Sequence, residues 1–192
     1  MSATHDSQGL ENPSRRRFLR VGLAGTAILA TVGVTSGVVG FRRVSTQASA
    51  EGFEFLRPSD VELFTTLVPA ILGTALPAHN PQIIREIILR IDDTCKRLGS
   101  PNQKELGQLF DLLGFAPTRR LAAGIKQPWS DTSSTDAEAF LERWRNSSVS
   151  LFNAAYRVLT KLTANAYFAM PESFAASGYP GPLAHMYNAI NN

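Results

Sequence analysis

The feature that most constrains the fold is an apolar stripe with helical spacing between residues 84 and 98. Its members recur at steps of three and four residues: Ile84, Ile87, Ile88, Ile91, Cys95 and Leu98. This spacing puts every member on one side of an α-helix, so that side must be buried. Asn80 and Pro81 precede the stripe as an expected cap and first helical residue, and Gly99 follows as an expected left-handed stop.

Helical signals recur through the rest of the chain after residue 50, whereas the alternation typical of strands is absent. Three predicted capping boxes, each a hydroxyl residue followed three positions later by Glu or Gln, are Ser59 with Glu62, Ser100 with Gln103, and Thr135 with Glu138. Residues 146–148 are expected to bend or break the longest helical stretch, and Pro171 to end it. The sequence therefore predicts an all-α protein, a small helical bundle of about five helices with an irregular Pro/Gly-rich C-terminal tail.

The N-terminal residues carry a different pattern, typical of an export signal. Arg15 and Arg16 are followed by Phe18 and Leu19, and then by the weakly apolar segment 21–40, which five glycines dilute. An arginine pair before such a segment indicates a twin-arginine signal. Because this pathway carries proteins that are already folded, we expect the twin-arginine translocase to export the chain folded.

A signal-peptidase site is predicted at the end of this segment. Ala48 and Ala50 supply the small-x-small pattern, which predicts cleavage before Glu51. Residues 1–50 are then the twin-arginine signal segment, and 51–192 form a single helical domain located in the periplasm or held at the inner membrane through a complex. Retention of the signal as a membrane anchor remains an alternative.

The charge of the chain is concentrated in the signal. Six of the 19 basic residues and two of the 16 acidic residues lie before residue 51, which leaves 13 basic and 14 acidic residues. A domain with a net charge of about −1 offers no basic surface for nucleic acid, so no nucleic-acid partner is expected.

The only cysteine, Cys95, cannot form a disulfide within the chain. Two interpretations remain open for it. Its place on the apolar stripe favours a buried small side chain. An oxidising destination also permits a disulfide to another subunit.

Few residues after the signal could carry chemistry. His79 and His185 lie far apart in the sequence, and Asp92 with Asp93 is the only adjacent acidic pair. Neighbouring residues on a helix point about 100° apart, so these two carboxylates do not converge on one site. We therefore expect them on a solvated face of the helix. Metal-ligand, dinucleotide and phosphate-loop motifs are absent from the sequence. We therefore predict no catalytic residue, bound cofactor or metal site in this chain.

The segment 166–182 is unusual in combining aromatic residues with prolines and glycines. Tyr179, Pro180, Gly181 and Pro182 form its end, and prolines lower the entropy lost when such a segment is ordered. Two interpretations remain open, a clamp on the core or a docking surface. Trp144, Tyr156 and the Tyr179 turn are candidate partner-binding residues if they are exposed, because Trp and Tyr often anchor interfaces.

Together with the signal and a helix that opens after residues 55–58, the patterns at 140–148, 167–171 and 178–182 resemble the small (gamma) subunit of periplasmic FAD-dependent dehydrogenase complexes, the gluconate 2-dehydrogenase subunit 3 family. The strongest match is the run from Gly178 to Pro182, whereas Phe174 stands where the family has a tryptophan. Residues 73–134 match only in being helical.

The resemblance implies a non-catalytic accessory subunit of an oxidoreductase complex. Such subunits bind a glucose–methanol–choline type flavoprotein that has no signal of its own, help it to mature as a chaperone does, and carry it through the twin-arginine pore. FAD is then expected in the partner subunit, and a cytochrome c subunit is a further expected partner. Two alternatives remain open, a stand-alone exported helical binding protein and an exported enzyme with an unrecognised site.

Overall fold

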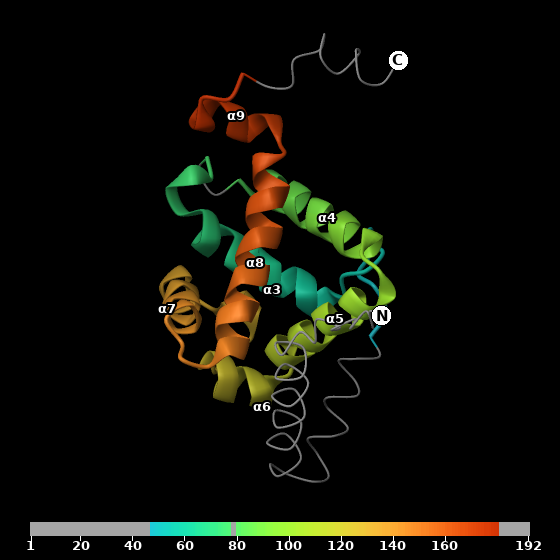
Figure 1. Ribbon diagram of the computed structural model, residues 1–192, viewed down its shortest axis with the longest axis vertical. Coiled ribbons are helices and arrows are strands. Elements are labelled where there is room, and N and C mark those ends of the chain that lie inside the picture. Colours follow the sequence, from blue (N-terminus) through green and yellow to red (C-terminus); the bar gives the residue numbers. More distant parts are fainter. Residues whose placement is uncertain (1–46, 78–79, 181–192) are drawn as a thin grey trace, which may run out of the picture. The chain divides into compact units, whose positions relative to one another are not determined.

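The computed structural model describes residues 47–77 and 80–180, which form helices and connecting turns with no β-strand within these ranges (Figure 1). Its α-helices are α3 (Pro58–Leu72), α4 (Pro81–Arg97), α5 (Ser100–Gly114), α6 (Ala116–Thr118), α7 (Ser134–Arg145), α8 (Ser150–Phe168) and α9 (Pro171–Ser177). Shorter helical turns are η1 (Gly73–Ala75), η2 (Arg119–Ala123) and η3 (Trp129–Asp131). The predicted all-α bundle is confirmed.

The described residues contain more α-helices than the expected five, for two local reasons. Residues 146–149 separate α7 from α8, as the polar run at 146–148 predicts. Residues 171–177 form α9, although an irregular tail was expected from residue 172 onward. Pro171 explains this difference, because a proline at the first helical position ends one helix and starts the next.

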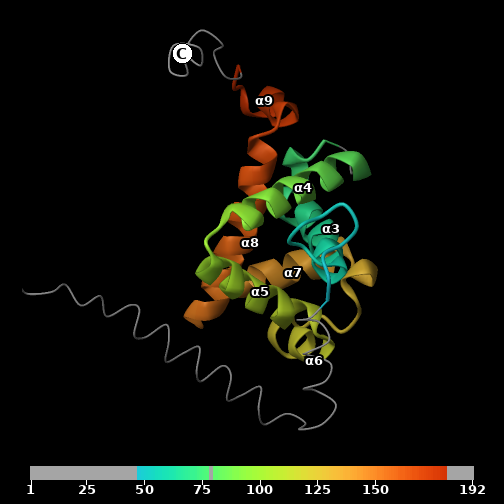
Figure 2. The same ribbon diagram turned by 90° about the vertical axis from the view of Figure 1, so that its right-hand side faces the viewer.

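Helix α3 lies at the centre of the bundle and contacts α4, α5, α7 and α8 (Figures 1 and 2). Leu63, Phe64 and Leu67 on α3 are almost completely buried. The Phe64 ring packs edge-on against Phe110 of α5, with 5.5 Å between ring centroids. Helices from both halves of the sequence therefore share one hydrophobic core.

The apolar stripe on α4 is buried as predicted. Its members Ile84, Ile87, Ile88, Ile91 and Cys95 all belong to the core. The last predicted member, Leu98, is the C-cap of α4 and is only partly buried. The Asn80 cap is also confirmed, because the Asn80 Oδ1 atom accepts a hydrogen bond from the Gln82 backbone N–H at 2.9 Å. This cap satisfies one of the free amide donors of the first helical turn.

The predicted capping boxes at Ser59 and Thr135 are wrong by a few residues. The N-cap of α3 is Arg57, two residues before Ser59, and the Asp60 carboxylate accepts a hydrogen bond from the Arg57 backbone N–H at 3.0 Å. Helix α7 is capped by Ser133, whose Oγ accepts from the Asp136 backbone N–H at 3.1 Å. In both cases an acidic residue that is shorter than glutamate occupies the third helical position.

The predictions for Gly99 and Ser100 are also wrong. Gly99 has a φ of −63° and is the N-cap of α5, so it is not a left-handed stop. The Gln103 side-chain amide instead donates to the carbonyl oxygens of Cys95 (3.2 Å) and Lys96 (2.9 Å). Gln103 thus satisfies free carbonyl groups at the end of α4 and ties α5 to it. Within the described ranges, no helix is both long and apolar enough to cross a membrane.

Candidate partner-binding surface

Two adjacent aromatic residues end α8: the ring of Tyr167 lies in the core and that of Phe168 lies at the surface. Tyr167 is completely buried, and its hydroxyl donates to the Ala75 carbonyl oxygen at 2.5 Å, which ties α8 to η1. The neighbouring Phe168 ring is 51% exposed, with its centroid 5.3 Å from that of Tyr167. Because Tyr167 is fixed, Phe168 is held at the surface with little freedom to turn inward.

Helix α9 presents a second aromatic residue at the surface. Gly178 ends α9 with a φ of +68°, a left-handed conformation that suits glycine. The Tyr179 backbone N–H then donates to the Phe174 carbonyl oxygen at 3.1 Å, and the two rings meet edge-on at 5.0 Å. Tyr179 is 50% exposed. Phe168 and Tyr179, called the exposed aromatic pair below, therefore flank α9 in the sequence, and both are exposed.

The structure separates the other candidate partner-binding residues. Pro180 is exposed beside Tyr179, whereas Gly181 and Pro182 lie outside the described residues. Tyr156 is half-buried on α8. The signal residues Arg15, Arg16, Phe18 and Leu19 and the histidines His79 and His185 also lie outside the described ranges.

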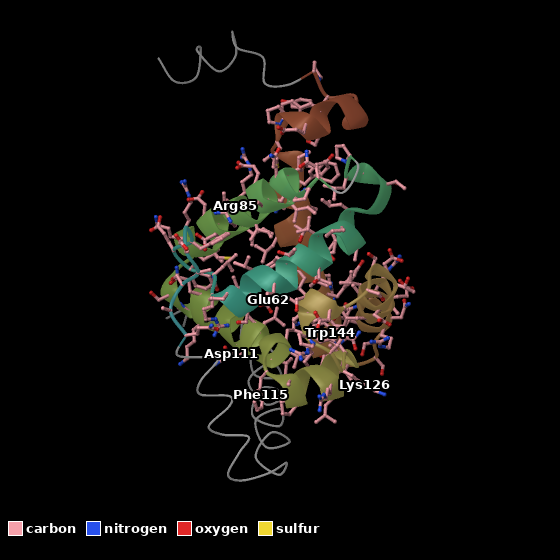
Figure 3. The ribbon with its side chains drawn as sticks, turned by 180° about the vertical axis from the view of Figure 1, so that it is seen from behind. Glu62, Arg85, Asp111, Phe115, Lys126 and Trp144 are labelled. Carbon is pink, nitrogen blue, oxygen red and sulfur yellow. The ribbon has the colours of Figure 1, made fainter. Side chains whose placement is uncertain are left out.

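Trp144 is a core residue and does not meet the condition of exposure. Its side chain is only 2% exposed, and its indole N–H donates to the Ala122 carbonyl oxygen at 2.9 Å. The ring stacks on Phe152 at 5.1 Å and meets Phe140 at 4.7 Å. Trp144 (labelled in Figure 3) thus joins α7, α8 and η2, and it is not available to a partner.

The predicted cleavage site joins the folded bundle before Glu51. Ala48 is exposed, but Ala50 packs against the core and its N–H donates to the Leu56 carbonyl oxygen at 2.8 Å. The Ala50 carbonyl oxygen accepts a hydrogen bond from the Phe53 N–H at 2.9 Å. Residues 49–56 together with Asp92, called the N-terminal clamp below, hold this segment against α4.

Asp92 is the centre of the N-terminal clamp, so the expectation of a solvated Asp92 is wrong. Its carboxylate accepts hydrogen bonds from the backbone N–H groups of Glu54 (3.0 Å), Phe55 (2.9 Å) and Leu56 (2.7 Å). The Asp92 residue is buried. Asp93 is exposed as expected and forms an ion pair with Arg97 at 2.9 Å. The acidic pair is therefore split between core and solvent.

A buried ionic cluster joins the first turn of α3 to α5. The Arg57 guanidinium contacts both Asp60 oxygens, at 2.8 and 3.1 Å, and also pairs with Asp111, labelled in Figure 3. Burial alone would lower the pKa of Arg57, but the hydrogen bonds and charges of Asp60 and Asp111 outweigh it and raise the pKa. These three side chains are all buried, and nothing in the spacing of the sequence pairs Arg57 with Asp111.

Cys95 lies in the core, which favours the first of its two interpretations. The residue is 0% exposed and is a free thiol. Burial, with the nearby carboxylates of Asp92 and Asp60, raises the pKa of the Cys95 thiol to about 12. A disulfide to another subunit would require the helices around Cys95 to open first.

We expect the Cys95 thiol of the native protein to be unreactive toward a disulfide reagent such as Ellman's reagent at pH 8, because the thiolate is the reactive form. Unfolding in guanidinium should expose one reactive thiol per chain. Stability should also fall as the pH rises from about 9.0 to about 12, because the unfolded thiol loses its proton first. Full labelling of the folded protein, or a subunit dimer that reduction dissociates, would contradict this assignment.

The described residues contain no group of three or more His, Cys, Asp or Glu side chains that could hold a metal ion. Two shallow clefts occur, one of about 200 Å³ between α3, α7 and α8 and one of about 320 Å³ between α4 and the start of α9. Sequence reasoning missed two exposed apolar residues, Leu121 (69%) and Val149 (44%). A single apolar residue in a short helix or at a helix start has no periodicity that could reveal its exposure.

Comparisons of this chain with protein-family models, with curated proteins and with solved structures give no match.

Proposed function

We propose that this protein is a non-catalytic small subunit that binds a FAD-dependent dehydrogenase of the glucose–methanol–choline type and exports it through the twin-arginine pathway. The partner flavoprotein carries the FAD and the reaction, and this chain contributes the export signal and a binding surface. The observation that carries the proposal is the exposed aromatic pair, Phe168 and Tyr179, which the fold holds at the surface.

The geometry around these two residues supports a binding role. Their neighbours Tyr167 and Phe174 fix the backbone through hydrogen bonds and ring contacts. Rigid aromatic side chains that are half-exposed lose little entropy when a partner covers them. The cleft between α4 and α9, lined by Ile83, Glu86 and Met170 among others, lies beside the same helix. A partner that covers α9 would therefore meet both apolar and acidic groups.

The export role is tested with a tagged full-length chain in its native host. We expect a protein with flavin absorbance to co-purify from the periplasm. Replacing Arg15→Lys and Arg16→Lys should leave both proteins in the cytoplasm, because one signal serves the two chains. A flavoprotein that still reaches the periplasm, in the normal amount, would contradict the escort role.

The same purification tests the binding surface. Phe168→Ala with Tyr179→Ala should lower the yield of the flavoprotein at least about tenfold, since central aromatic anchors contribute about 2 kcal/mol each or more. Leu121→Ala with Val149→Ala is the matched control, because it removes two exposed apolar side chains elsewhere on the domain.

The control should retain the flavoprotein, and both double variants should keep the helical circular dichroism of the wild-type protein. Loss of the flavoprotein in the control alone would show that the interface lies at Leu121 and Val149 instead. A stable wild-type monomer with no flavoprotein would favour a stand-alone binding protein.

A further inference from the structure

Arg119, the first residue of the turn η2, is buried to the same degree as Arg57 but lacks carboxylate partners. Arg57 is 8% exposed and Arg119 is 7% exposed. Arg57 pairs with Asp60 and Asp111, whereas Arg119 forms no ion pair within the ranges that the structure describes. A buried charge is costly unless an opposite charge pairs with it. Arg119 is therefore a buried cation whose anion is missing from the described residues.

The guanidinium of Arg119 leaves most of its five N–H donors unused. Its Nη1 atom donates to the Gly114 carbonyl oxygen at 3.2 Å, and its buried Nε atom has no partner. The Nη2 atom has no hydrogen bond to the described residues either, but it is not closed off from solvent as Nε is. Nη2 is thus the atom at which an anion can meet this guanidinium.

The charges around Arg119 do not replace the missing anion. Burial and the charge of the neighbouring Arg120 lower the pKa of Arg119, and the charge of Glu62 on α3 opposes them without reversing the effect. Glu62, labelled in Figure 3, is exposed and forms no ion pair with Arg119. Arg120 is exposed too, and its Nε donates to a backbone group, the Lys126 carbonyl oxygen, at 3.2 Å.

The backbone that carries Arg119 has a rare form and is held in place. Residues 119–123 make one π-helical turn, a form that proteins often use at functional sites. The turn ends at Gly124, whose φ is +69°. Helix α7 fixes this end, because an Arg143 nitrogen donates to the Ala123 carbonyl oxygen at 2.5 Å and the Trp144 indole donates to that of Ala122. Arg119 therefore extends from a rigid support.

We propose that Arg119 binds one carboxylate of the partner protein, an aspartate or glutamate side chain. Such a group can accept a hydrogen bond from Nη2 while its charge offsets those of Arg119 and Arg120. A phosphate dianion suits the site less well, because one accessible nitrogen leaves most of its oxygens without donors and Glu62 repels its two charges more strongly. The assignment of the carboxylate to a partner protein rests on the proposed function, but the preference for a carboxylate rests on the site alone.

The preference is tested by titrating sodium acetate into the full-length protein labelled with nitrogen-15, with sodium phosphate and sodium chloride compared at the same ionic strength. We expect acetate to cause saturable chemical-shift changes at the Arg119 side-chain Nε–H and at the backbone amides of residues 118–124. Phosphate and chloride should cause smaller changes there. Glu62→Gln should strengthen acetate binding about two- to fivefold, because it removes a nearby negative charge.

Arg119→Met separates a binding role from a structural one. The variant should lose the acetate response, yet it should unfold at the same urea concentration as the wild-type protein or at a higher one, because it removes a buried charge that has no partner. An arginine with a structural role would lower that concentration when replaced. Glu105→Gln, an exposed position on α5, is the matched control for Glu62→Gln and should bind acetate like the wild-type protein.

The co-purification experiment then tests the source of the carboxylate. Arg119→Met should lower the yield of the flavoprotein about fivefold or more, and an unchanged yield would overturn the assignment to the partner. Equal responses to acetate, phosphate and chloride, no effect of Glu62→Gln, or a loss of stability in Arg119→Met would each overturn the site itself. Because the acetate titration needs no partner, its failure can be distinguished from failure of the wild-type protein to co-purify a flavoprotein.

Discussion

Replacing Asp92→Ala should lower the free energy of unfolding by about 3 kcal/mol, because three backbone N–H groups lose their acceptor and each buried unpaired donor costs about 1–3 kcal/mol. The N–H groups of Glu54 and Phe55 are only partly buried, whereas that of Leu56 is buried. The expected loss therefore lies near the lower end of the summed costs of the three donors. Urea denaturation followed by circular dichroism measures the change.

The neighbouring residue supplies a matched control for this prediction. Asp93→Ala removes an identical side chain one position along α4, where it forms only an exposed pair with Arg97. Its expected cost is about 0.5 kcal/mol or less. Equal effects of the two variants would contradict a central role of Asp92 in the N-terminal clamp.

Replacing Arg57→Met should lower the free energy of unfolding by about 3–5 kcal/mol, because it leaves the buried carboxylates of Asp60 and Asp111 without their cation. The pKa of Arg57 is raised, so its stabilising contribution is present at pH 7 and is lost only as the pH rises through the raised pKa. The effect of the substitution should therefore be measurable by urea denaturation at pH 7.

Two further variants test the origin of this effect. Arg97→Met removes a cation from an exposed pair and should leave the free energy of unfolding almost unchanged. Combining Arg57→Met with Asp60→Asn and Asp111→Asn should recover most of the lost stability, since no buried charge is then left alone. A loss of less than 1 kcal/mol for Arg57→Met would contradict the buried ionic cluster.

The helical part of the fold was predictable because helical periodicity and helix breakers are local signals. The stripe on α4, the Asn80 cap and the break at 146–148 could each be recognised from a few neighbouring residues. The caps were less predictable, because several hydroxyl and acidic residues compete near each helix start. At α3 the start is fixed by the local pairing of Asp60 with Arg57, and Arg57 also pairs with the distant Asp111 of α5, which no local pattern reveals.

The candidate surface was only partly predictable, because exposure depends on contacts between distant segments. Trp144 and Tyr179 were equally suitable anchors by residue type. Trp144 is buried because the Ala122 carbonyl oxygen and the Phe152 ring come from segments that periodicity cannot pair with it. Asp92 was misjudged for the same reason, since its three partners lie more than 30 residues earlier in the chain.

If the proposed signal is cleaved after Ala50, the N-terminal clamp should control the rate of that cleavage. The peptide bond after Ala50 lies inside a loop that is closed by the hydrogen bond from Ala50 to Leu56 and held to α4 by Asp92. Peptidases act on such bonds mainly when the segment opens locally. The rate of signal removal then depends on the fraction of molecules in which the clamp is open, so a more stable clamp slows the cleavage. Asp92→Ala should then be processed faster than the wild-type protein, and equal rates would place the cut elsewhere.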